Sequence, residues 1–167
     1  MKISLLSLKP LLKNKLLWGG LVWVAVFPFV YEVLPTRIDM TMDKSLPFTV
    51  WITEKQFNPT VHHYVMFKPT VQNEYTAKVG YFFKEISCQG GQELIITENK
   101  EYFCDGRFIG MARSTDQYGK PVENFVFNGV VPKDSLFMTG THPRSYDSKY
   151  YGFVKINQIE RGATPIW

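Results

Sequence analysis

An uncharged apolar run at residues 16–31 is the feature that most constrains how this chain can fold. Only Glu32 interrupts its continuation to residue 34. A helix rises about 1.5 Å per residue, so residues 16–34 would reach about 28 Å, close to the thickness of a hydrocarbon core. Trp18, Trp23 and Tyr31 are of the types that favour membrane interfaces. The run therefore predicts a transmembrane anchor at residues 16–34.

Two other interpretations of this run remain open. A cleaved secretory signal also has lysines followed by an apolar stretch, but residues 32–37 contain no small-x-small cleavage site. A buried helix of a soluble protein is the other alternative.

The charge pattern before the apolar run predicts its orientation. Four lysines precede the first acidic residue: Lys2, Lys9, Lys13 and Lys15. Such an excess marks the cytoplasmic side of a membrane, so we expect residues 1–15 in the cytoplasm and residues 38–167 outside it. The formal net charge of the whole chain is only +4, with acids and bases interspersed after the anchor, and this pattern predicts no nucleic-acid partner.

Two cysteines, Cys88 and Cys104, are the only ones in the chain. An even number outside the cytoplasm predicts a disulfide, and two free buried thiols are the alternative. These cysteines and three histidines form no spacing typical of a zinc site, so we expect neither a metal nor another cofactor.

Residues 38–167 are predicted to form one mainly β domain of short antiparallel strands. Turn residues such as Gly90-Gly91 and Asp105-Gly106 separate the apolar runs. No long helical periodicity follows the anchor, although residues 71–78 can hold a short helical turn. The predicted strands are residues 48–53, 64–67, 80–88, 93–97, 101–104, 108–112, 135–139 and 152–156.

Lys84 breaks the pattern of its predicted strand. Alternate residues of a strand share a face, which places Lys84 with Phe82 and Ile86. One interpretation is a lysine that extends its ammonium group to water. The other is a buried lysine whose pKa is lowered, because burial disfavours the ammonium form. A neutral amine is what a general base needs near neutral pH.

Two further segments complete a recognisable pattern. Ser45 lies in a Ser-x-Pro loop after the anchor, and residues 145–152 read Ser-Tyr-Asp-Ser-Lys-Tyr-Tyr-Gly. Either segment alone is typical of an ordinary hydrogen-bonded loop. In this order, with the Lys84 strand between them, they resemble the type I signal peptidase superfamily. The small size and residues 105–121 are most similar to the conjugative-transfer branch, the TraF-type pilin-maturation peptidases.

The resemblance, which covers roughly residues 38–155, implies roles for four residues. Ser45 would be the acylating nucleophile and Lys84 the base that takes its proton. Ser145 would orient the lysine, and Asp147 would be a structural acid paired with Lys149, which stands where the family usually has arginine.

Some positions depart from the family pattern. Asp43 stands where cellular signal peptidases have a hydroxyl that helps to stabilise the oxyanion. Glu85 replaces a basic residue, and two turns differ, at residues 88–91 and 140–142. The Ser45 amide remains as one oxyanion donor, and the second is unassigned.

The implied function is a bacterial inner-membrane, single-pass serine endopeptidase with a periplasmic catalytic domain. It would cleave, or cyclise, a membrane-inserted pilin precursor for a conjugative type IV secretion system, in contact with the lipid bilayer and transfer-apparatus proteins. The alternatives are a housekeeping-like signal peptidase of exported preproteins, a catalytically silent component of the transfer apparatus, or an anchored β domain that binds a partner. We also expect strand 48–53 to pair with an extended substrate at a sheet edge.

Overall fold

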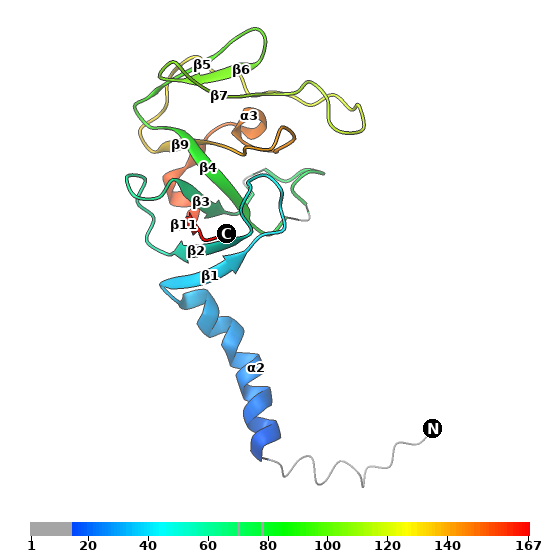
Figure 1. Cartoon of the computed structure of the whole chain (residues 1–167), viewed down its shortest axis with the longest axis vertical. Coiled ribbons are helices and arrows are strands. Elements are labelled where there is room, and N and C mark those ends of the chain that lie inside the picture. Colours follow the sequence, from blue (N-terminus) through cyan, green and yellow to red (C-terminus); the bar gives the residue numbers. More distant parts are fainter. Residues whose placement is uncertain (1–14, 70, 78) are drawn as a thin grey trace. The chain divides into compact units, whose positions relative to one another are not determined.

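The computed structural model describes residues 15–69, 71–77 and 79–167, which fall into two units on either side of the boundary between Pro35 and Thr36 (Figure 1). In the first unit, helix α2 (Lys15–Val33) is apolar and long enough to cross a membrane, and none of its residues is buried. These properties fit a membrane anchor. Of the segment predicted to be cytoplasmic, residues 1–14 lie outside the described residues.

The second unit is built on a seven-stranded antiparallel sheet with the order β1-β2-β11-β3-β4-β9-β10. Its strands are β1 (Thr36–Met40), β2 (Val50–Glu54), β3 (Tyr64–Phe67), β4 (Phe82–Gln89), β9 (Ser135–Thr139), β10 (Val154–Lys155) and β11 (Ile159–Pro165). The strand β11, which comes after all the others in the chain, lies between β2 and β3.

A smaller antiparallel sheet, of order β7-β6-β5-β8, completes this unit. Figure 1 shows β5, β6 and β7 beyond one end of β4, and the short helix α3 (Ser148–Tyr151) beside β9. The strands are β5 (Glu93–Ile96), β6 (Glu101–Cys104), β7 (Arg107–Met111) and β8 (Gly129–Val130). The fold is therefore mainly antiparallel β with one amino-terminal apolar helix, as the sequence predicts.

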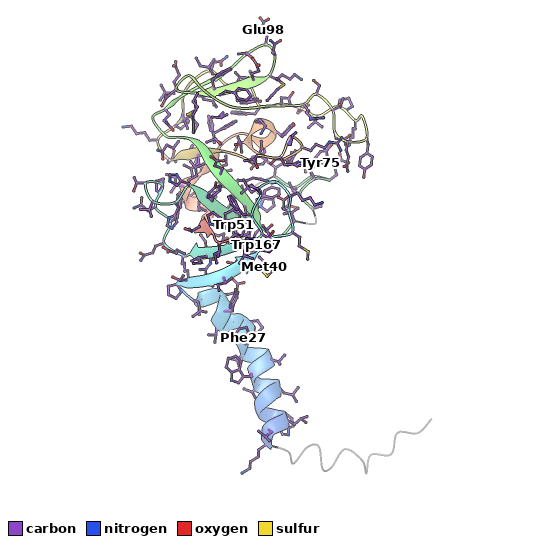
Figure 2. All side chains as sticks on the ribbon, in the orientation of Figure 1. Phe27, Met40, Trp51, Tyr75, Glu98 and Trp167 are labelled. Atoms are coloured by element: carbon purple, nitrogen blue, oxygen red, sulfur yellow. A yellow bond between two sulfur atoms is a disulfide. The ribbon has the colours of Figure 1, made fainter. Side chains whose placement is uncertain are left out.

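Strands β4 and β9 contribute much of the core of the large sheet. All five residues of β9 are buried, and Leu136 and Met138 pack with Phe82 of β4 in one core cluster. A second cluster surrounds Trp51, which is fully buried and stacks on Phe83 with ring centroids 5.2 Å apart (Figure 2). Together these clusters hold β2, β3, β4 and β9 in fixed register.

A third core cluster joins the two sheets. Tyr102 and Leu94 of the small sheet pack against Phe137 of the large sheet. At the same place Cys88 of β4 and Cys104 of β6 form a disulfide, with Cα atoms 5.7 Å apart. The small sheet is thus attached to the large one by both apolar packing and a covalent bond.

The predicted strands agree with the structure to different degrees. Residues 64–67, 101–104 and 135–139 are strands with the predicted bounds, whereas residues 152–156 shrink to the two residues of β10. The sequence analysis missed β1, β8, β11 and helix α3. In β11, Gly162, Ala163 and Pro165 have low strand propensity, and pairing on both sides overrides that propensity.

The expectation that strand 48–53 offers a free edge is wrong. β2 pairs with β1 on one side and with β11 on the other, so its backbone groups are already used. The edge strands of this sheet are β1 and β10.

Replacing both cysteines, Cys88→Ser with Cys104→Ser, should lower the melting temperature by about 10 °C. The disulfide closes a loop of sequence separation 16, which stabilises the folded state by roughly 3 kcal/mol through the entropy of the unfolded chain. Thermal unfolding followed by circular dichroism measures the effect. The wild-type chain in reductant is the control and should melt near the double variant; equal melting temperatures for all samples would contradict the prediction.

Candidate active site

Ser45 lies in the loop between β1 and β2, and neighbouring packing fixes its position. The next residue, Leu46, is buried in the same core cluster as Trp51 and Phe83. On the other side, the Ser45 carbonyl oxygen accepts hydrogen bonds from the His142 amide at 3.1 Å and from the Thr141 hydroxyl at 3.4 Å. The Ser45 side chain is therefore held at the junction of two loops, with only 6% of the residue exposed.

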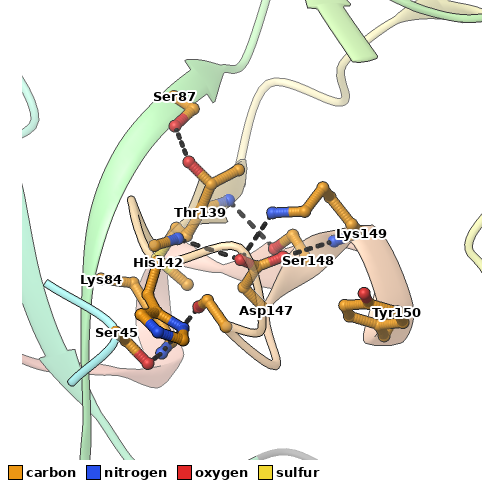
Figure 3. Close-up of polar contacts among 12 residues, drawn as sticks. Ser45, Lys84, Ser87, Thr139, His142, Asp147, Ser148, Lys149 and Tyr150 are labelled. Carbon is orange, nitrogen blue, oxygen red and sulfur yellow. Dashed lines mark hydrogen bonds and ion pairs between the residues drawn. The ribbon is translucent and has the colours of Figure 1, made fainter. Parts of the chain in front are cut away.

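Lys84 comes from the middle of β4 and is completely buried. On one side of β4, Lys84 pairs with Val65 of β3. On the other side, the next residue, Glu85, pairs with Thr139 of β9. The Lys84 Nζ lies 2.5 Å from Ser45 Oγ and 3.3 Å from Ser145 Oγ (Figure 3). The structure thus brings together three residues that are up to 100 positions apart in the chain.

The surroundings of Lys84 act on its pKa in opposite directions. Burial lowers the pKa, and the carboxylates of Asp43 and Asp147 raise it, while the Lys149 charge lowers it slightly. The net pKa lies below the ordinary value of a lysine because the side chain has no access to water. The neutral amine is therefore more favoured at Lys84, next to the Ser45 hydroxyl, than it is in an exposed lysine.

Asp43 contacts both members of this pair. Its Oδ2 accepts a hydrogen bond from Ser45 Oγ at 2.6 Å and lies 3.4 Å from Lys84 Nζ, while its Oδ1 accepts from the Ser45 amide at 3.1 Å. Burial would raise the pKa of this carboxyl, but the Lys84 charge and the hydrogen bonds from Ser45 hold the pKa below its usual value. An ionised Asp43 thus limits, without reversing, the effect of burial on Lys84.

Asp147 and Lys149 support the loop that carries Ser145. Asp147 is fully buried; its Oδ2 accepts from Lys149 Nζ at 2.7 Å and from the Gly140 amide at 3.0 Å. Its Oδ1 accepts from the Lys149 amide at 3.1 Å and so caps helix α3. The contacts of Asp147 and Lys149 fix this loop (Figure 3).

Gly140 permits the closest approach in the site. A Cβ atom there would lie 2.7 Å from both the Ser45 carbonyl oxygen and Ser145 Cβ, and would overlap Ser145 Oγ. Only a residue without a side chain leaves room for these two serines to converge on Lys84. The sequence analysis noted this position only as a departure from a family turn and missed its steric role.

The arrangement has the parts of a nucleophile with its base. A hydroxyl and an amine lie within hydrogen-bonding distance, and a second hydroxyl contacts the amine. The Ser45 amide is the nearest candidate donor for an oxyanion, and Asp43 occupies it. The sequence analysis did not foresee that Asp43 contacts both Ser45 and Lys84; its place two residues before Ser45 was the available signal.

The family model described as "Signal peptidase, peptidase S26" matches residues 13–167. The match spans helix α2 and the whole β unit, including all the residues of the site described above. No curated protein matches the chain.

Gly140→Ala should lower the free energy of unfolding by roughly 1–3 kcal/mol, because backbone atoms near Ser45 must move to admit the methyl group. Chemical denaturation measures the change. Gly80→Ala is the matched control, since a Cβ at Gly80 would meet no atom within 4 Å. A stability loss that is equal in the two variants would show that Gly140 has no special steric role.

Proposed function

We propose, starting from the fact that this chain belongs to the signal peptidase family, peptidase S26, that it is a membrane-anchored serine endopeptidase with a Ser45–Lys84 dyad. The observation that carries the proposal is the 2.5 Å contact between Ser45 Oγ and the amine of a completely buried lysine. Its substrate class follows from the family: a preprotein.

In the proposed mechanism, neutral Lys84 takes the proton of Ser45, and Ser45 Oγ attacks the carbonyl carbon of the scissile bond. The tetrahedral intermediate collapses to an ester on Ser45, and the Lys84 ammonium gives its proton to the leaving amine. A water molecule, deprotonated by Lys84, then attacks the ester and releases the acyl group. An amine of the substrate itself can replace water, in which case the product is cyclic.

Ser145 is the positioning residue in this scheme. Its hydroxyl oxygen lies 3.3 Å from Lys84 Nζ, and its loop is fixed by the Asp147–Lys149 pair and by the space at Gly140. A lysine held from two sides keeps its lone pair directed at Ser45 Oγ. Such preorganisation costs nothing at the moment of reaction.

We propose the inner membrane of a bacterium as the location, with a single pass through the anchor predicted at residues 16–34, most of which forms α2, and a periplasmic domain (residues 38–167). The length and apolar character of α2 support the anchor, and the lysines at residues 1–15 support a cytoplasmic amino terminus. The Cys88–Cys104 disulfide fits an oxidising compartment.

The finer proposal is that the substrate is a pilin precursor of a conjugative type IV secretion system. It is supported by the small size of the domain at residues 38–167 and by residues 105–121, which are most similar to the TraF-type peptidases; the motifs at residues 45–47, 84 and 145–152 support the wider signal peptidase family. A housekeeping-like signal peptidase is the alternative. Co-expression with a pilin precursor and with an ordinary exported preprotein, followed by mass spectrometry of both products, separates these roles and reports cyclisation.

Ser45→Ala and Lys84→Ala should each reduce precursor processing by at least roughly a thousandfold, because the residues of such a pair act as a unit. Immunoblots of precursor and mature forms measure processing, with the membrane content of each variant checked in parallel. Ser114→Ala and Lys133→Ala, at exposed positions, are the matched controls and should process normally. Normal maturation by both dyad variants would refute the assignment.

A catalytically silent component of the transfer apparatus is the second candidate, and Asp43 favours it. The carboxylate holds the Ser45 hydroxyl and the Ser45 amide, the two groups that acylation needs free, and it strengthens the ammonium form of Lys84. For the enzyme to act, the substrate must displace this carboxylate. A wild-type chain that processes no precursor would support the silent alternative.

Asp43→Asn should move the acidic limb of the pH–rate profile to lower pH. The charged groups that face the Lys84 amine are Asp43, Asp147 and Lys149. The Asp43 carboxylate raises the pKa of Lys84, so its removal lowers that pKa and leaves more neutral base at a given pH. Rates of cleavage of a fluorogenic peptide across pH measure the shift. Asp134→Asn, at an exposed ion pair, should leave the limb unchanged; a shift to higher pH in Asp43→Asn would contradict the prediction.

A further inference from the structure

A cavity of about 420 Å³ opens beside Ser145, and the mechanism described above uses none of its other lining residues. It is formed by three segments that are distant in sequence: the loop at residues 74–75, the connection at residues 113–122, and residues 144–150. Its size is typical of a binding site for a small group or a few residues. Ser145 lines the cavity and also contacts Lys84 Nζ, so a ligand at that end lies next to the reacting atoms.

Three tyrosines give the cavity a preformed aromatic wall. Tyr75 stacks on Tyr146 with ring centroids 5.0 Å apart, and Tyr146 stacks on Tyr150 at 5.4 Å. The rings are held from behind, because Asn73 donates to the Tyr146 hydroxyl at 2.7 Å and the Tyr75 hydroxyl donates to Asp116 at 3.0 Å. Burial and the Asp116 carboxylate raise the pKa of Tyr75 to about 12, so this donor keeps its proton.

The acidic and basic residues around the cavity differ in whether they already have partners within the protein. The acidic residues are already paired: Glu74 with Lys120, and Asp116 with the Tyr75 hydroxyl and two backbone amides. The guanidinium groups of Arg113 and Arg144, by contrast, form no hydrogen bond or ion pair with any residue in the described part of the chain. The groups left to meet a ligand are therefore cationic and are suited to a planar carboxylate.

We infer that this cavity binds a carboxylate of the peptide substrate, with Arg113 and Arg144 as its partners and the tyrosine wall against the adjoining side chain. The carboxylate belongs to an acidic side chain or to the substrate's carboxyl terminus. Because an extended chain advances at most about 3.3–3.6 Å per residue and the cavity reaches Ser145, the bound group lies within a few residues of the scissile bond. The inference rests on the proposed function, since it takes the ligand to be the substrate.

Binding is best measured without turnover, on the full-length Ser45→Ala protein in detergent micelles. The probes are rhodamine-labelled nine-residue alanine–leucine peptides that carry one Glu at successive central positions, each with a Gln twin. Every peptide is made with a carboxyl-terminal acid and with a carboxyl-terminal amide, which separates the two sources of carboxylate. Fluorescence anisotropy gives the dissociation constants.

We expect a Glu peptide, or a terminal acid, to bind about tenfold or more tightly than its neutral twin, as for a hydrogen bond between charged groups. The preference should disappear in Arg144→Gln and Arg113→Gln and persist in Lys55→Gln, an exposed control of equal charge change. Equal binding of charged and neutral peptides to the parent protein would overturn the inference, as would an unchanged preference in the arginine variants. Because Ser45 is absent from the assay, a failed dyad assignment would not alter either result.

Discussion

The enclosure of one amine governs the rest of this structure. The Lys84 side chain has no exposed surface, and an isolated charge buried in this way would lower the stability of the fold. Polar groups offset this cost: the hydroxyls of Ser45 and Ser145 lie within hydrogen-bonding distance of the amine, and the carboxylates of Asp43 and Asp147 act on it electrostatically. These partners come from two loops, residues 43–45 and 145–147, so both loops must lie in place beside β4 before the amine is enclosed.

Because Lys84 is buried, the Asp43 carboxylate has two opposing effects. A carboxylate near a buried amine stabilises the fold by offsetting the cost of any remaining positive charge. The identical contact reduces the fraction of neutral lysine and occupies the Ser45 amide. The Asp43 carboxylate therefore favours the stability of the fold and opposes a neutral Lys84, and about a third of the Asp43 side chain remains open to solvent.

Particular residues show how far the sequence could predict this molecule. Lys84 could be identified as a candidate site residue because strand alternation placed its charge on an apolar face. Ser45 could be identified because its loop matched a family pattern. The mainly β fold followed from short apolar runs between turn residues. The strand β11 was missed because its Gly, Ala and Pro residues carry no strand signal, and its place depends on pairing with β2 and β3. The steric role of Gly140 and the contact of Asp43 with Lys84 depend on distances between remote segments, which no spacing along the chain encodes.

The position of β11 has a consequence for the order of events during synthesis. The loop that carries Ser45 precedes β2, and Lys84 lies on β4 next to β3; the two halves of the sheet are joined through β11. The Trp167 carbonyl oxygen also accepts hydrogen bonds from the Thr49 and Val50 amides, close to that loop. A ribosome must therefore release nearly all of residues 36–167 before Ser45 and Lys84 can meet. The nascent chain therefore has no Ser45–Lys84 contact until synthesis of this unit is nearly complete.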